Sequence, residues 1–331
     1  MLNKALKKVM AGDVLSEIES AAMVDAIANG ENPAAAAGLL TALSLRGESV
    51  SEMTGAAEFL RDRMLDVNAG DCADIVGTGG DGGRSFNIST TAAFVAAGAG
   101  VRMAKHGNRA VSGKCGAADV LEELGVKLND TPESLAQSIH DNGIAFLFAR
   151  NLHPVMAKVA PLRRDLGIRT IFNLVGPLAN PAHAVYMVVG VYHERLVKPF
   201  AEVLRNLGVQ RGLVVHSEDG LDEISSLAPT HAAVLTQEDI CETIIKPEEL
   251  LSDAALCSGS LEGGDKTENS HILLDILTGR DHTAKRGAVL LNAAAICCAA
   301  GLGDSIKSCI PLTAESIDSG AAMEKLRRLQ A

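Results

Sequence analysis

From about residue 72 onward the sequence alternates short apolar runs with helical patterns, and this alternation restricts the fold more than any other feature. The apolar runs cover residues 72–77, 101–107, 144–149, 185–192 and 213–216. Strands that alternate with helices build βαβ units, so the pattern predicts an α/β fold with a mainly parallel central sheet flanked by helices. The polar segment 261–270 predicts a loop.

Residues 1 to about 66 carry helical patterns only. Asn32 before Pro33 is typical of a helix start, because Asn caps the first turn and Pro fits the first helical position. A further helix is expected to begin near Ser51, with Phe59 and Leu60 on its apolar stripe. The region therefore predicts a small all-helical domain of four short helices. Its spare apolar surface either packs within the chain or pairs with a second copy, and the sequence leaves both open.

The composition of the 331-residue chain excludes several classes of partner. A formal net charge of −11 disfavours nucleic acid and acidic membranes, and 3% aromatic residues with no Trp leave few surfaces for stacking bases. The seven cysteines show no CxxC spacing and no signal peptide is recognisable, which predicts a cytoplasmic protein. The most apolar stretch, residues 288–301, is too short to cross a bilayer.

Glycine is enriched between the first apolar run and the helix that follows it. Five of the seven residues from Gly77 to Gly83 are glycine, and Ser89 and Thr90 open the next helix. Such a turn lets backbone N–H groups converge on an anion, and the helix N-terminus adds its positive dipole end. A tight turn between a strand and a helix needs fewer glycines, so the segment predicts phosphate binding.

Gly77, Gly79 and Gly82 also satisfy the GxGxxG fingerprint of dinucleotide-binding proteins. That fingerprint expects an acidic residue about 20 positions further on, at the end of the next strand. The next strand ends instead in a basic loop that starts at Lys105. The sequence therefore disfavours an NAD-dependent dehydrogenase and favours a phosphorylated ribose as the ligand.

This second loop repeats the arrangement of strand, glycine-containing basic segment and helix. Lys105, Arg109 and Lys114 supply positive charge in an acidic chain, and Asn108 and Ser112 supply neutral hydrogen-bonding groups. Loops that follow successive parallel strands lie at the same edge of the sheet. The two loops are therefore expected to hold both ends of one multiply phosphorylated ligand.

Two further clusters carry chemically useful side chains. Arg163 and Arg164 follow His153 on a predicted helix, although paired arginines there are usually a solvated face. Asp222 and Glu223 follow a strand in a glycine-containing turn, where adjacent carboxylates either suit Mg²⁺ beside phosphates or form only a polar loop. No nucleophile–base constellation and no histidine spacing typical of a metal site is recognisable.

Together these motifs resemble one family. GTGGDGGRSFNIST (77–90), KHGNRAVSG (105–113), the segment from HPVMAKV to GPLANP (153–181) and GLDEIS (220–225) occur in the order and spacing of the anthranilate phosphoribosyltransferases. The resemblance covers nearly the whole chain and places it among proteins like nucleoside phosphorylases and phosphoribosyltransferases. It implies a helical domain of residues 1–66, joined by helices from about 154–180, and an α/β domain of residues 67–331. It also implies an active site in the hinge cleft and a homodimer formed through the helical domains.

The resemblance also assigns roles by position. The residues expected to bind 5-phosphoribosyl 1-pyrophosphate are Gly77, Gly79, Gly80, Asp81, Ser85, Asn87, Ser89, Thr90, Lys105, His106, Gly107, Asn108, Arg109, Ser112, Gly113 and Ala117. Those expected to bind anthranilate are Gly77, Asn108, His153 and Arg163. Ser89, Asp222 and Glu223 would hold Mg²⁺, and no residue is assigned as a catalytic acid, base or nucleophile. Many members have serine where this chain has Gly113, Cys115 and Ala117, which puts side-chain donation at 113 and 117 in doubt.

The implied reaction suits these residues. A neutral aryl amine displaces pyrophosphate from the ribose, so the protein needs to neutralise leaving-group charge and position the substrates rather than activate a nucleophile. The alternatives are a nucleoside phosphorylase of the same fold and a non-enzymatic relative that binds nucleic acid. Pyrimidine phosphorylases differ from KHGNR in the second loop, and the net charge of −11 argues against nucleic acid.

Overall fold

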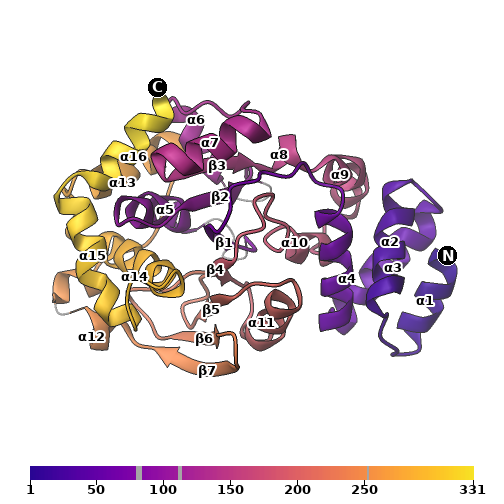
Figure 1. Ribbon diagram of the computed structural model, residues 1–331. Helices are drawn as coiled ribbons and strands as arrows, with labels where there is room; N and C mark the ends of the chain where they lie inside the picture. Colours follow the sequence, from indigo (N-terminus) through magenta and orange to yellow (C-terminus); the bar gives the residue numbers. More distant parts are fainter. Residues whose placement is uncertain (80–83, 111–113, 252) are drawn as a thin grey trace.

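The computed structural model describes residues 1–79, 84–110, 114–251 and 253–331, and Figure 1 shows a helical region beside a larger sheet-containing region. The helical region contains α1 (Leu2–Met10), α2 (Glu17–Ala28), α3 (Pro33–Arg46) and α4 (Val50–Arg61). Ser16 and Ser49 cap α2 and α4, and the Asn32 side chain accepts from the Ala35 N–H at the start of α3. The four predicted N-terminal helices are confirmed. Within the described ranges, no helix combines the length and apolar character needed to span a membrane.

The sheet has seven strands in the order β3-β2-β1-β4-β5-β6-β7. The strands are β1 (Ala73–Gly77), β2 (Met103–Gly107), β3 (Ile144–Phe148), β4 (Tyr186–Gly190), β5 (Arg211–Ser217), β6 (Thr230–Leu235) and β7 (Ile240–Ile245). The first five strands of this order run parallel, and β6 and β7 join antiparallel at one edge. The predicted mainly parallel sheet is confirmed, and the antiparallel pair extends it.

The order of the strands reverses at the middle of the sheet. From β1 the chain proceeds to β2 and β3 on one side, and then to β4 and β5 on the other. Gly77 and Gly190 are paired at the carboxyl ends of β1 and β4. Loops that leave two such strands in opposite directions open a crevice, which is where α/β proteins bind ligands.

Helices cover both faces of the sheet (Figure 1). On one face Ile75, Met103 and Val188 share an apolar core with α5 (Ile88–Gly98), α6 (Ala117–Glu123), α13 (Lys266–Leu277), α14 (Ala284–Ala299), α15 (Ile306–Asp318) and α16 (Ala321–Gln330). On the other face Ala104 and Val189 share a core with α7 (Pro132–Asn142), α10 (Ile171–Val175), α11 (Val197–Asn206) and the N-terminal helices. The short elements are α8 (Ala149–Leu152), η1 (Glu194–Leu196), α12 (Pro247–Leu250) and η2 (Ala254–Cys257).

Two later segments pack against the N-terminal helices. α9 (Pro154–Leu166) contacts α2 and α3, and α10 contacts α3 and α4. Figure 1 shows α9 and α10 between the sheet and the N-terminal helices. The helical region is therefore built from residues far apart in the sequence.

The loop predicted for residues 261–270 is wrong in its second half, because α13 begins at Lys266. Asp265 accepts from the N–H groups of Thr267 and Glu268, which closes a capping box at the first turn. Leu273, at 0% exposure, anchors the helix in the core. Polar residues at the start of a helix therefore resembled a loop in the sequence.

Candidate active site

The glycine-rich turn touches the carboxylate pair directly. The Gly79 N–H donates to Asp222 Oδ2 at 2.8 Å, and Gly79 has a φ of +70°, which favours glycine. A methyl group at Gly77 would lie 2.4 Å from Asp222 Oδ2, and one at Gly190 would lie 1.6 Å from the Asp222 carbonyl oxygen. Both strand ends are glycine because the Asp222 segment lies against them. Gly80 and Asp81, predicted for the same turn, lie outside the described residues.

The N-terminus of α5 brings the second carboxylate to the same place. The Ser89 N–H donates to Glu223 Oε1 at 3.3 Å, and Lys105 Nζ donates to Ser89 Oγ at 3.4 Å. Thr90 is buried one residue further along α5. Amide groups in the first turn of a helix have no partner within the helix and attract anions. Four segments of the chain thus bring together one group of residues, which are Gly79, Ser89, Lys105, Asp222 and Glu223.

Asn87 and Ser85 are held by residues 262–269, for which the sequence predicts only a loop. Asn269 Nδ2 donates to Asn87 Oδ1 at 3.0 Å, and Asn269 Oδ1 accepts from the Gly264 N–H at 2.8 Å. Ser85 forms an isolated antiparallel bridge with Glu262. Asn269 fixes the residue before α5, and no motif in the sequence links the two positions.

Lys105 is 3% exposed, which makes it a buried cation in the middle of the site. Its Nζ also donates to the carbonyl of Ile75, and burial lowers the pKa of its ammonium. Buried Asp74 accepts from Asn180 Nδ2 at 2.7 Å and from the His106 N–H at 3.2 Å. Asp74 is an acidic residue within an otherwise apolar strand, and this departure from the strand pattern is the sequence signal that points to it.

His106 and His153 form a buried pair, with their Nε2 atoms 3.1 Å apart. Burial lowers the pKa of His153 to about 4, and burial, His153 and Lys105 hold the pKa of His106 well below its usual value. Both rings are therefore neutral at neutral pH, and one Nε2 donates to the other.

This pair predicts a loss of stability in mild acid. An unfolded His has a pKa near 6.5, so between pH 6.5 and about 4 the unfolded chain binds a proton that folded His153 does not. As the pH is lowered from 7.5 to 5, the free energy of unfolding should therefore decrease by about 2 kcal/mol from His153 alone. Denaturant unfolding of the wild type and of His153→Asn at both pH values measures this. Equal pH dependence in the two proteins would contradict the neutral buried pair.

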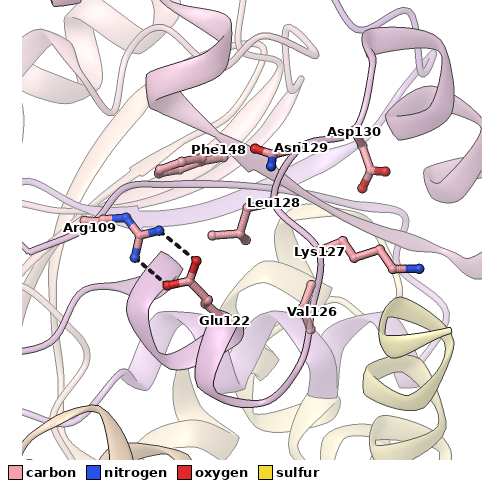
Figure 2. A pocket seen from close by; sticks show the side chains of 8 residues that line it. All are labelled: Arg109, Glu122, Val126, Lys127, Leu128, Asn129, Asp130 and Phe148. Carbon is pink, nitrogen blue, oxygen red and sulfur yellow. Dashed lines mark hydrogen bonds and ion pairs between the residues drawn. The ribbon is translucent and has the colours of Figure 1, made fainter.

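The segment after β2 is joined to α6. A methyl group at Gly107 would lie 2.8 Å from the Phe146 ring, so glycine permits this close approach. Exposed Asn108 accepts from the Arg109 N–H through Oδ1 at 2.8 Å. Figure 2 shows the Arg109 guanidinium directed at Glu122, with hydrogen bonds of 2.8 and 2.9 Å. Ser112 and Gly113 lie outside the described residues, and Ala117 begins α6.

Arg109 lines a pocket beside α6. The pocket, of about 430 Å³, is lined by Arg109, Glu122, Phe148 and residues 126–130 (Figure 2). Arg109 is the one predicted site residue among those that line it. Arg109 also bonds Asp119 at 3.0 Å, so its charge is used within the protein.

Arg163 lies in the last turn of α9 and is half-buried. Burial lowers the pKa of its guanidinium, and it has no hydrogen-bond or ion-pair partner in the described part of the chain. Its helix is linked to the sheet through Arg169, whose guanidinium lies 4.6 Å from the centre of the Tyr192 ring. The Tyr192 N–H donates to Thr78 Oγ1 at 3.1 Å, beside the glycine-rich turn.

The donor set fits Mg²⁺ better than a transition metal. Two carboxylates, Asp222 and Glu223, face the turn with the Ser89 hydroxyl nearby, and oxygen ligands suit Mg²⁺. Mg²⁺ commonly takes one or two carboxylates and completes its shell with water and phosphate oxygens. No group of three or more His, Cys, Asp or Glu side chains that could hold a metal occurs among the described residues.

The fold and the site define a glycosyl transferase. A family model described as the helical bundle domain of the glycosyl transferase family matches residues 3–64, and the model of its a/b domain matches residues 69–323. Curated and solved relatives narrow the assignment. The chain belongs to the anthranilate phosphoribosyltransferases, as the resemblance predicted.

Three relatives illustrate the similarity. Anthranilate phosphoribosyltransferase of Geobacter sulfurreducens is 46% identical over an alignment of 346 positions, which covers 99% of this chain and 98% of the relative. The crystal structure of the Thermus thermophilus enzyme has a TM-score of 0.90 and 43% identity, with 99% of each chain covered. The Saccharomyces cerevisiae enzyme in complex with PRPP and Mg has a TM-score of 0.87 and 26% identity, covering 99% of this chain and 96% of that one.

Proposed function

We propose that the protein transfers the phosphoribosyl group of 5-phosphoribosyl 1-pyrophosphate to the amine of anthranilate, in tryptophan biosynthesis. The observation that carries the proposal is the contact of the glycine-rich turn and the α5 N-terminus with the two carboxylates. Binding of a magnesium pyrophosphate group requires anion-binding amides beside oxygen ligands for Mg²⁺, and this contact supports that arrangement. The yeast relative in complex with PRPP and Mg supports it, and the nucleoside phosphorylase and nucleic-acid alternatives are not favoured.

The pyrophosphate end of the substrate is assigned to the glycine-rich turn. The amides of Gly79 and Ser89, which donate to Asp222 and Glu223 in the structure, would donate to phosphate oxygens of the bound substrate, and Lys105 adds a buried positive charge. Mg²⁺, held by Asp222, Glu223 and Ser89, would supply charge neutralisation for the leaving pyrophosphate. The further contacts assigned to this substrate are Gly77, Gly80, Asp81, Ser85, Asn87, Thr90, His106, Gly107, Asn108, Arg109, Ser112, Gly113 and Ala117.

Anthranilate is assigned to the side of the site that faces α9, where Gly77, Asn108, His153 and Arg163 contact it. Half-buried Arg163 has no protein partner in the described ranges, so it is suited to bind the anthranilate carboxylate. Asn108 Nδ2 is a second donor, because Oδ1 is engaged by the Arg109 N–H. The neutral pair of His106 and His153 keeps positive charge away from the amine, whose lone pair must stay available.

The reaction needs no activated nucleophile. The C1–O bond of the ribose breaks and its electron pair leaves with pyrophosphate, while the amine lone pair forms the N–C1 bond. The new ammonium then loses one proton to water. Catalysis rests on holding the amine near C1 and on stabilising the departing negative charge through Gly79, Ser89 and Lys105.

A fluorescence assay tests the proposal. Purified protein with Mg²⁺ and 5-phosphoribosyl 1-pyrophosphate should consume anthranilate, and anthranilate fluorescence should fall with release of one pyrophosphate per product. A folded protein that leaves the fluorescence unchanged would overturn the proposed function. Phosphate with a nucleoside in place of the two substrates is the control for phosphorylase activity.

The domain division belongs to the same proposal: residues 1–66 with helices from about 154–180 form one domain, and residues 67–331 form the other. The contacts of α9 and α10 with α2, α3 and α4 support it. A cytoplasmic location is supported by the seven cysteines, which are all free thiols.

We also propose a homodimer through the helical domain. Ile18 on α2 and Leu45 on α3 are each 83% exposed, which is unusual for large apolar side chains. Ile18→Glu with Leu45→Glu should shift the mass in light scattering from two chains to one. Leu302→Glu, at an exposed site of the α/β domain, is the matched control and should leave the dimer intact. An unchanged mass for the double variant would exclude this face as the interface.

A further inference from the structure

One carboxylate joins both ends of the second substrate loop. Asp119 Oδ2 accepts from the Ala110 N–H at 3.0 Å and from the Gly116 N–H at 2.9 Å. Asp119 Oδ1 accepts from Arg109 Nη1 at 3.0 Å. The carboxylate therefore binds three donors that flank the loop, and residues 111–113 between them lie outside the described residues. We call Ala110, Gly116 and Asp119 the loop neck.

The backbone at the loop neck is packed as closely as glycine allows. A methyl group at Gly116 would lie 2.4 Å from the Ala110 nitrogen and 2.7 Å from the Asn108 carbonyl oxygen. The Ala118 N–H donates to the same Asn108 carbonyl at 3.2 Å. The backbone of Asn108 is thus fixed by Ala118 in the first turn of α6, and Asp119 is the next residue of that helix.

Arg109 completes the arrangement from outside. Its guanidinium bridges Asp119 and Glu122 and lies 5.6 Å from the centre of the Phe148 ring. Figure 2 shows the arginine and Glu122 side by side above α6. Hydrogen bonds to a charged acceptor are stronger than neutral ones. Those on the Asp119 carboxylate also lower its pKa despite partial burial, so the group is ionised at neutral pH.

We infer that Asp119 is a positioning residue for the binding of 5-phosphoribosyl 1-pyrophosphate, because it closes the loop neck and thereby fixes Asn108 at the sheet edge. The inference rests on the proposed function for the identity of the ligand. Asp119 itself contacts backbone amides and Arg109, not the substrate. Loss of the Asp119 carboxylate should therefore weaken the binding of 5-phosphoribosyl 1-pyrophosphate more than it lowers kcat.

The test compares Asp119→Asn with Glu122→Gln, which removes a carboxylate from the same helix and the same arginine but leaves the loop neck intact. Titration calorimetry with 5-phosphoribosyl 1-pyrophosphate and Mg²⁺, without anthranilate, should show Kd raised about tenfold or more for Asp119→Asn. For Glu122→Gln the change should stay within about twofold. In steady state the KM for this substrate should rise and kcat should stay within about threefold for Asp119→Asn.

A second variant and a second readout keep the inference testable. Gly116→Ala forces the loop neck apart without changing Asp119 and should weaken binding as Asp119→Asn does. Trypsin cleavage after exposed Lys114, followed by mass spectrometry, should be faster in both variants than in the wild type. Wild-type binding in either folded variant, or equal weakening by Glu122→Gln, would overturn the inference. If the wild type binds no 5-phosphoribosyl 1-pyrophosphate, the proposed function is wrong. If cleavage after Lys114 is unchanged in both variants, Asp119 does not hold the loop neck closed.

Discussion

Replacing Asp222 by Asn together with Glu223 by Gln is expected to raise the Mg²⁺ concentration for half-maximal activity by more than about 100-fold. Loss of groups that only support metal ligands already costs about 10–100-fold in affinity, and this variant removes both ligating carboxylates. Asn and Gln have nearly the same shapes as Asp and Glu, so the packing of residue 222 against Gly77 and Gly190 remains. Activity measured against Mg²⁺ concentration, after removal of bound metal with EDTA, gives the shift.

Glu218→Gln is the matched control for the carboxylate pair. Glu218 lies four positions before Asp222 in the same connection, and its Oε1 lies 3.2 Å from His231 Nε2 on β6. Its Mg²⁺ titration should match that of the wild type. If the double variant also titrates like the wild type, Asp222 and Glu223 are only a polar loop and the assigned Mg²⁺ site is wrong.

Arg163→Ala is expected to raise the KM for anthranilate by roughly 10–100-fold, while the KM for 5-phosphoribosyl 1-pyrophosphate changes little. A hydrogen bond between charged groups contributes about 1.5–3 kcal/mol, and in this protein the substrate carboxylate would be the partner of Arg163. The same substitution should not lower the melting temperature, because it removes a half-buried cation without breaking a described ion pair. Steady-state kinetics and thermal unfolding measure the two effects.

Arg164→Ala provides the comparison for Arg163. Arg164 is the next residue on α9 and is exposed, so its substitution changes the charge of the helix equally. We expect its anthranilate KM to stay within about twofold of the wild type. Equal effects of the two substitutions would indicate general attraction of the anion, and an unchanged KM for Arg163→Ala would remove this residue from the site.

Much of the fold could be predicted because local patterns agree with the tertiary structure. The apolar runs became β1 to β5, and Asn32 with Pro33 marked the start of α3. The start of α13 was missed, since Lys266 and the polar residues after it resemble a loop until Leu273 reaches the core. Strand order depends on packing between distant segments, which local patterns do not encode.

The sequence predicts those parts of the candidate site whose functional residues lie together in one segment. The glycine-rich turn and the carboxylate pair were recognisable singly, whereas the bond from Gly79 to Asp222 joins residues 143 positions apart. The partner of Asn87 is Asn269, and Arg109 turns to Asp119 and Glu122. These contacts depend on side-chain direction, which a motif does not specify.

The packing of α9 and α10 on the N-terminal helices has a consequence for synthesis on the ribosome. α4 ends at Arg61, whereas α10 ends at Val175. At about 5–20 residues per second, the first four helices emerge on the order of ten seconds before these partners. In that interval the faces of α2, α3 and α4 that later meet α9 and α10 stay uncovered. The nascent chain therefore completes its first structural region only after β1, β2 and β3 have been made.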